Sequence, residues 1–300
     1  MTAMHELTPG KPVRLSDHVW RVLAPNPSVF TGPGTNTYLV VDGDDITVID
    51  PGPADESHLD ALLAAAAQAG GRIRRIVCTH THEDHSPGAA PLAARCGVPQ
   101  IGTPPPGDGY NDMTFRPDQV PAENEVIACG SLRLRAIATP GHVSNHFCFL
   151  LEDEGLLFTG DHLMQGSTVV IVPPEGSMRE YLASLRKLEN LAVTAIAPGH
   201  GQLMHDPQQV IAATIRHRLA RESKTLRALQ ALLAVGADDA ATADILPRAY
   251  DDVPVAMHPV ARLSLEAHLV KLAEDGIVRR TDIHAGPVGE HLANARWLTG

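Results

Sequence analysis

Residues 79 to 86 bring together side chains that can bind a metal ion. Their sequence, Thr-His-Thr-His-Glu-Asp-His-Ser, holds three imidazoles and two carboxylates. Imidazole nitrogens and carboxylate oxygens suit a borderline divalent ion such as zinc. His80 and His82 can point to one side of an extended segment, whereas Asp84 and His85 can point to a second centre as the chain turns. We expect this stretch to bind metal; the alternative is a polar loop with incidental histidines.

The residues around this stretch indicate how the chain would position it. The run Ile73–Cys78 ends in apolar residues that are typical of a strand entering a core, and a helix is expected from Ser86. The metal-binding side chains would therefore lie on a strand-to-helix turn. Three further turns place a possible ligand after a glycine: Pro-Gly-His at His142, Thr-Gly-Asp at Asp161 and Pro-Gly-His at His200.

The H-x-H-x-D-H motif followed by these three turns, in this order, resembles the metallo-β-lactamase superfamily. The resemblance implies a site for two divalent ions, most simply zinc, with a water or hydroxide between them. It assigns one ion to three histidines and the other to an aspartate and two histidines, with one aspartate bridging the ions. These ligands are His80, His82 and His142 for the first ion, Asp84, His85 and His200 for the second, and Asp161 for the bridge.

Two other residues are candidates for supporting roles in this site. Asp50 ends the expected strand Ile46–Ile49, and the resemblance places such an aspartate beneath the metal loop, where it holds the loop by hydrogen bonds. The alternative is a simple strand-ending turn. His146 follows His142 by four residues, so it could approach the substrate or protonate the leaving group. A role behind the ligands or at the surface is the alternative.

The chemistry expected from this set is metal-assisted hydrolysis. The chain has no Gly-x-Ser-x-Gly turn that would present a serine nucleophile. Paired dications can ionise water near neutral pH, and Asp84 is expected to orient that nucleophile. His162 is expected to be structural. The remaining histidines lack metal spacing and are expected to be ordinary surface or core residues: His5, His18, His58, His205, His217, His258, His268, His284 and His291.

Length and composition indicate the number of domains, the compartment and the kind of partner to expect. A chain of 300 residues with 44% hydrophobic residues predicts one large domain and one smaller one. The four cysteines lack paired spacing, no apolar run reaches the length of a membrane span, and the N-terminus lacks a secretory segment. We therefore expect a cytoplasmic protein. Residues 1–215 carry 13 basic and 24 acidic residues, so long polyanions should not be attracted to them.

The expected elements predict an α+β protein. Alternating runs predict strands at 19–23, 38–41, 126–129, 132–138, 147–151 and 156–159, and helical periodicity covers 56–69 and 178–190. From the residues alone this is a mixture of α and β. The resemblance implies an αββα sandwich of two sheets with helices outside, which we assign to residues 1–215.

Residues 216–300 are predicted to form a smaller helical domain. Helices are expected at 207–235, 238–248 and 258–274, followed by a strand pair at 276–280 and 296–298. This order resembles the winged-helix module of one branch of the superfamily, typified by lactamase-β-like protein 2. In that branch the resemblance implies cleavage of single-stranded RNA. The balanced charge, 11 basic and 11 acidic residues, favours instead a module that packs on the catalytic domain or on a second subunit.

The substrate is left open between three hypotheses. The first is a phosphodiesterase, with single-stranded RNA as a candidate substrate. The second is a hydrolase of thioesters or small acyl esters, similar to glyoxalase II, although the cationic substrate clamp expected there is missing. The third is a metal-binding protein without turnover. A true β-lactamase is disfavoured because those enzymes generally lack the bridging carboxylate that Asp161 would supply.

Overall fold

The structure, a computed structural model, describes residues 7–107, 109–282 and 292–300. The chain divides into two compact units. The first unit comprises Met1–Thr139, Asn145–Val169 and Asn190–Gln208, and the second comprises Pro140–Ser144, Val170–Glu189 and Gln209–Gly300. The chain passes more than once between the units, and the predicted boundary between residues 215 and 216 stays a prediction. The expectations for His5, His284 and His291 fall outside the described residues.

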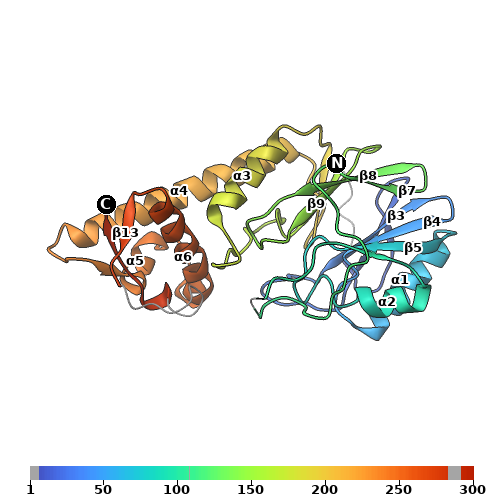
Figure 1. Ribbon diagram of the computed structural model, residues 1–300, viewed down its shortest axis with the longest axis horizontal. Coiled ribbons are helices and arrows are strands. Elements are labelled where there is room, and N and C mark those ends of the chain that lie inside the picture. Colours follow the sequence, from blue (N-terminus) through green and yellow to red (C-terminus); the bar gives the residue numbers. More distant parts are fainter. Residues whose placement is uncertain (1–6, 108, 283–291) are drawn as a thin grey trace. The chain divides into compact units, whose positions relative to one another are not determined.

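The first sheet of the first unit follows the chain in order, β1-β2-β3-β4-β5-β6. Strands β1 to β4 are antiparallel, and β4, β5 and β6 are parallel because helices connect them. The strands are Val13–Arg14, Val19–Leu23, Asn36–Asp42, Asp45–Ile49, Arg72–Val77 and Gln100–Ile101. Helix α1 (Glu56–Gln68) connects β4 to β5, and α2 (Ala89–Cys96) connects β5 to β6 (Figure 1).

The second sheet of this unit has the order β11-β10-β9-β8-β7. Its strands are antiparallel except for β10 and β11, which run parallel. In sequence order from β7 they are Val126–Cys129, Leu132–Ala138, Phe147–Leu151, Leu156–Gly160 and Ala195–Pro198. Their alternating burial follows the predicted alternation of apolar residues.

The core of the first unit lies between these two sheets. One apolar cluster combines Tyr38 and Val40 from the first sheet with Phe149 and Phe158 from the second. The rings of Tyr38 and Phe158 are 5.1 Å apart between centroids. The opposite face of the first sheet packs against α1 and α2, as the cluster around Leu59 shows (Figure 1). The predicted α+β class is confirmed.

The second unit contains most of the remaining helices and a small sheet of order β12-β14-β13. Its elements are α3 (Met178–Glu189), α4 (Pro207–Leu233), β12 (Ala240–Ala241), α5 (Thr242–Ala249), α6 (His258–Glu274), β13 (Val278–Arg280) and β14 (Arg296–Thr299). Its apolar core surrounds Trp297, which is 1% exposed and donates a hydrogen bond to Thr242. None of the described helices combines the length and apolar character needed to cross a membrane.

One predicted helix in this unit begins later than expected. We expected a helix from Asp238, but residues 240 and 241 form strand β12 and the helix begins at Thr242. Ala240 pairs with Trp297, a partner that lies far along the chain. Local periodicity could not predict this pairing.

Candidate metal site

The predicted metal loop lies where β5 ends and before α2 begins. Its backbone is held by tight turns: the amide of His85 donates to the carbonyl of His82, and the amide of Ala89 donates to that of Ser86. The helix begins at Ala89 and not at Ser86 as expected. This leaves a longer irregular segment, in which side chains can point to different sides.

A first group of possible ligands comprises His80, His82 and Asp161. One ligand atom of each lies within 4.8 Å of those of the others. Nε2 of His80 is 3.1 Å from Nδ1 of His82, and the His80 side chain is buried. His80 and His82 come from the loop after β5, and Asp161 follows β10 of the other sheet. The sheets therefore bring together residues that are about 80 positions apart.

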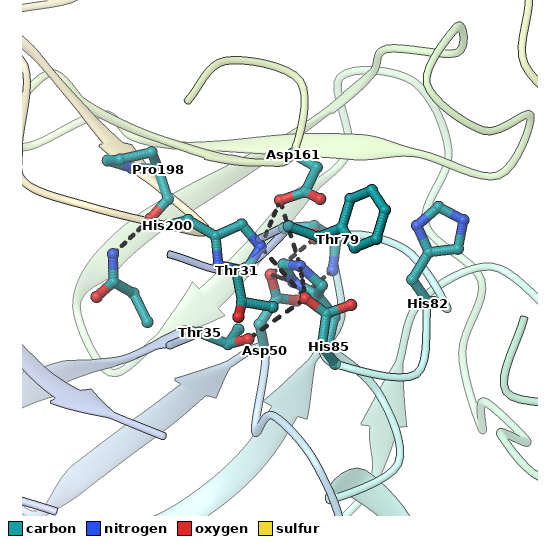
Figure 2. Close-up of polar contacts among 12 residues, drawn as sticks. Thr31, Thr35, Asp50, Thr79, His82, His85, Asp161, Pro198 and His200 are labelled. Carbon is teal, nitrogen blue, oxygen red and sulfur yellow. Dashed lines mark hydrogen bonds and ion pairs between the residues drawn. The ribbon is translucent and has the colours of Figure 1, made fainter. Parts of the chain in front are cut away.

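A second group comprises Asp84, His85 and His200, again with ligand atoms within 4.8 Å of one another. Nε2 of His200 lies 3.2 Å from Oδ2 of Asp84. Oδ1 of Asp161 lies 3.1 Å from Nε2 of His200 and 3.3 Å from Nε2 of His85. Asp161 thus contacts the second group while it belongs to the first, which is the position required of a bridging carboxylate (Figure 2).

The predicted ligand His142 belongs to the second unit. Its Nδ1 lies 2.7 Å from the carbonyl oxygen of Val170. Because a carbonyl can only accept, Nδ1 carries the proton and Nε2 of the neutral ring is left for another partner. This tautomer suits a metal ligand. The contribution of His142 to the first ion stays a prediction.

Asp50 supports ligands of both groups. Its carboxylate accepts hydrogen bonds from the amide and hydroxyl of Thr79, both at 2.7 Å, and lies 2.9 Å from Nδ1 of His85. Since the Thr79 hydroxyl donates to Asp50, it must accept from Nδ1 of His80, which is 3.0 Å away. Asp50 therefore orients His85 directly, as Figure 2 shows, and His80 through Thr79. In both rings Nδ1 is engaged on this side, so Nε2 is the nitrogen that could bind a metal ion. The predicted support by Asp50 is confirmed, and the part played by Thr79 was not foreseen.

The charges of the site suit cations. Burial would raise the pKa of the Asp161 carboxyl, but His200 and His85 outweigh it and hold that pKa well below its usual range. Burial, aided by His85 and His82, lowers the pKa of His80 well below its usual range, so His80 is neutral and its lone pair is available. Burial opposes protonation of His200, but Asp161 and Asp84 raise its pKa to about 10.

The buried Nε2 of His85 makes no hydrogen bond within the part of the chain that the structure describes, although two carboxylates lie within 3.5 Å. Burial opposes protonation of His85, yet Asp84 and Asp161 raise its pKa well above the usual range. Without a cation, His85 and His200 hold protons between carboxylates. A divalent ion would replace those protons and coordinate the same atoms. The donor set therefore fits divalent metal.

Two glycines permit this close packing. A Cβ atom at Gly199 would lie 2.7 Å from Cε1 of His85, and one at Gly160 would lie 2.4 Å from the hydroxyl oxygen of Thr79. Real Cβ atoms essentially never come so close. The glycines that precede the ligands Asp161 and His200 thus leave room for the metal loop, which is a physical reason for the Gly-Asp and Gly-His turns.

The remaining candidate histidines lie outside the two groups. His146 is 1% exposed, its Nδ1 is 2.9 Å from the Thr139 hydroxyl, and its ring lies 5.0 Å from that of His80. The surface alternative for His146 is therefore wrong. A position behind the ligands agrees with this burial, and its predicted proton transfer stays a prediction. His162 is fully buried, in agreement with a structural role.

Comparisons with known proteins agree with this geometry. Residues 30–200 match the metallo-beta-lactamase superfamily, and residues 241–286 match the beta-lactamase associated winged helix domain. Among solved structures, a beta-lactamase domain protein from Burkholderia ambifaria has a similar fold. Its TM-score is 0.77 at 20% identity, with 98% of this chain and 95% of that chain covered.

Relatives in sequence extend over most of the chain. A beta-lactamase-like protein 2 homolog from Caenorhabditis elegans is 30% identical over 303 residues, with 99% of this chain and 95% of the relative covered. An atrochrysone carboxyl ACP thioesterase from Aspergillus fumigatus is 33% identical, with 72% of this chain and 66% of the relative covered. The predicted resemblance to the lactamase-β-like protein 2 branch is confirmed. This chain belongs to the metallo-β-lactamase superfamily and carries the winged-helix domain associated with it.

Proposed function

We propose that this protein is a hydrolase that depends on two divalent ions, most simply zinc. The position of Asp161 carries the proposal, because one carboxylate belongs to the first ligand group and contacts both imidazoles of the second. When bound, such ions would lower the pKa of water from ~16 toward ~7 and polarise the carbonyl or phosphoryl oxygen of the substrate.

The residues of the site have distinct parts in this proposal. Asp84 is the most exposed carboxylate among the ligands, with 27% of its side chain accessible against 12% for Asp161. Its exposed edge can accept a hydrogen bond from the attacking water and orient it. Thr35 lies 3.4 Å from Oδ2 of Asp84 and holds the other side of the carboxylate. Asp161 and His85, which are more deeply buried, hold the site together.

For the substrate we propose a thioester or other acyl ester with an apolar acyl group. Two relatives, 33% and 35% identical, are named thioesterases. Exposed apolar side chains also occur in two loops whose backbones bond to the site: Val29, Phe30, Tyr110 and Met113. The carbonyl of Gly34 accepts from His200, and the amide of Asp112 donates to the carbonyl of Thr81. Such side chains favour an apolar substrate over a polyanion.

Phosphodiester cleavage is the second candidate, because a winged-helix domain can contact nucleic acid. A helix that reads a groove must present an open face. In α6 the consecutive residues from Ser264 to Leu269 are all buried, and the helix contacts α3 and α5 within the second unit. This burial favours a packing role for the domain. Retention of metal without turnover is the third candidate, and assembly into a homodimer stays a prediction.

A metal-defined activity screen tests the proposal. The zinc-loaded protein would be offered acyl thioesters of increasing chain length, bis(p-nitrophenyl) phosphate and single-stranded RNA. We expect thioester hydrolysis that is lost in Asp161→Ala and His82→Ala but retained in His205→Ala, which changes an exposed histidine outside both groups. Cleavage of RNA or the phosphodiester alone would assign the second candidate. Bound zinc with no turnover of any substrate would contradict the enzymatic proposal.

A further inference from the structure

Three side chains on the first sheet hold the turn that carries His200. These are Arg21 on β2 and Asn36 and Tyr38 on β3, here called the turn clamp. All three are at most 2% exposed. The turn itself, residues 198–202, follows β11 at the edge of the second sheet. The pairing of Ile196 with Met204 closes this turn, and the carbonyls between them need further partners.

The clamp satisfies the backbone of this turn almost continuously. The side-chain Nδ2 of Asn36 donates to the carbonyls of Pro198 and Gly201 at 3.0 and 2.9 Å. The backbone amide of the same residue donates to the carbonyl of Gly199 at 2.7 Å, a bond that does not depend on the side chain. The hydroxyl of Tyr38 donates to the same Pro198 carbonyl at 2.8 Å. Figure 2 shows Pro198 beside His200. Hydrogen bonds thus reach the carbonyls on both sides of His200.

Arg21 shows that this arrangement costs stability. Its guanidinium is buried and contacts the side-chain oxygen of Gln202 at 3.3 Å, and its Nη2 has no hydrogen-bond partner among the described residues. Burial lowers the pKa of Arg21, which expresses the cost of keeping this charge away from water. A well-packed apolar residue would usually be more stable at such a position. A costly buried network beside a ligand is typical of a functional constraint.

The two ligand groups depend on the clamp to different extents. Asp161 follows β10, which is held by β9 on one side and β11 on the other. The metal loop is tied to β9 separately, since the amide of Phe147 donates to the carbonyl of Thr79 at 2.8 Å. The turn of His200 is tied to the end of β10 by one bond, from the Gly199 amide to the Gly160 carbonyl at 2.8 Å, and it is closed by the pairing of Ile196 with Met204. The clamp adds the contacts to the carbonyls within the turn, and the Gly34 carbonyl contacts Nδ1 of His200.

We propose that the turn clamp is a positioning device that sets the cation affinity of the Asp84, His85 and His200 group and leaves the His80, His82 and Asp161 group unaffected. The inference rests on the proposed metal site. Loss of a side chain that orients a metal ligand typically weakens affinity by about 10–100-fold. We expect this loss for Asn36→Ala and a smaller one for Tyr38→Phe, which removes a single hydroxyl.

A double-mutant cycle on zinc affinity tests the proposal. Zinc dissociation constants would be measured by chelator competition for Asn36→Ala and Tyr38→Phe, each alone, with His82→Ala and with His200→Ala. In the His82→Ala background the remaining ion lies in the second group, so each clamp variant should still weaken binding. In the His200→Ala background the clamp has no ligand to position, and neither variant should change the affinity.

Thr47→Val is the matched control. Thr47 is fully buried on β4 and bonds Arg75, so the variant loses a buried hydrogen bond of the same sheet without touching the turn. It should lower thermal stability but leave both affinities unchanged. Equal effects of the clamp variants in both backgrounds, or none in the His82→Ala background, would overturn the inference. Failure of the wild-type protein to bind zinc would instead overturn the proposed function.

Discussion

Asp50 contacts residues that orient ligands of both groups, so replacing it should change both zinc affinity and folding stability. Comparing three substitutions at this position separates the two effects. The side chain is 2% exposed and accepts from Thr79 and His85. Its backbone has a φ of 51°, a left-handed conformation that asparagine tolerates and alanine adopts only with strain. Asp50→Asn preserves shape and backbone preference but offers an NH₂ group in place of one carboxylate oxygen. Asp50→Ala removes every acceptor, and Asp50→Gly removes them without the strain.

The magnitudes follow from these contacts. Removing one partner of a buried, charged network costs about 3–5 kcal/mol, which we expect for Asp50→Ala in the metal-free protein. Asp50→Gly should differ from Asp50→Ala by about 1 kcal/mol through relief of the left-handed strain. Asp50→Asn retains an acceptor for the Thr79 amide and should cost about 1–3 kcal/mol. Its NH₂ group would oppose the proton on Nδ1 of His85, so zinc affinity should fall by about 10–100-fold.

Denaturant unfolding of the metal-free variants gives the stability changes, and chelator competition gives the zinc affinities. Far-ultraviolet circular dichroism would show whether each variant is folded before the affinity is interpreted. A folded Asp50→Asn variant that binds zinc as tightly as the wild type would refute the role given to Asp50. Equal stability of Asp50→Ala and Asp50→Gly would refute the argument from backbone strain.

Three more predictions concern packing, protons and the second unit. Gly199→Ala should weaken zinc binding at least 10-fold in isothermal titration, since its Cβ would lie 2.7 Å from His85. Gly97→Ala is the control: among the described residues beyond its chain neighbours, no atom lies within 4 Å of the added Cβ, and the affinity should not change. Zinc uptake at pH 7 should release protons, because carboxylates raise the pKa of His200 to about 10, and affinity should therefore fall with falling pH. In the metal-free protein that proton stabilises the fold fully below about pH 6.5, and the contribution is lost as pH rises toward 10. Calorimetry of zinc binding in buffers of different ionisation enthalpy measures the proton release. A binding enthalpy that is the same in every buffer would contradict it. Trp297→Ala should destabilise the second unit by about 3–5 kcal/mol in denaturant unfolding, and an unchanged midpoint would contradict the buried core described there.

The residues of the site were largely predictable because they lie in short motifs. The composition of the H-x-H-x-D-H loop indicates metal binding by itself, whereas the glycine turns before Asp161 and His200 were assigned through the resemblance to the metallo-β-lactamase superfamily. The strand before Asp50 likewise indicated where that carboxylate would lie, and its hydrogen bonds confirm the predicted support. Most strand and helix limits in the first unit also agree with the periodicity to within a few residues.

The missed features depend on contacts between distant segments. Tyr38 begins a stretch predicted only as a strand, and Asn36 precedes it, yet their partner Pro198 is about 160 residues away. Strand β12 was missed for the same reason, since its hydrogen-bonding partner is β14. The burial of His146 was missed in the same way: its spacing from His142 allowed an exposed position, whereas it packs against His80, His162 and Thr139.

The metal content of the protein, and the dependence of hydrolysis on that metal, test most directly whether a two-ion site carries the activity. Anomalous diffraction from crystals grown with zinc should show two ions, one at each ligand group, with Asp161 between them. Removal of zinc should abolish thioester hydrolysis, and its return should restore it. A single ion away from Asp161, or hydrolysis that persists in the metal-free protein, would contradict the central claim.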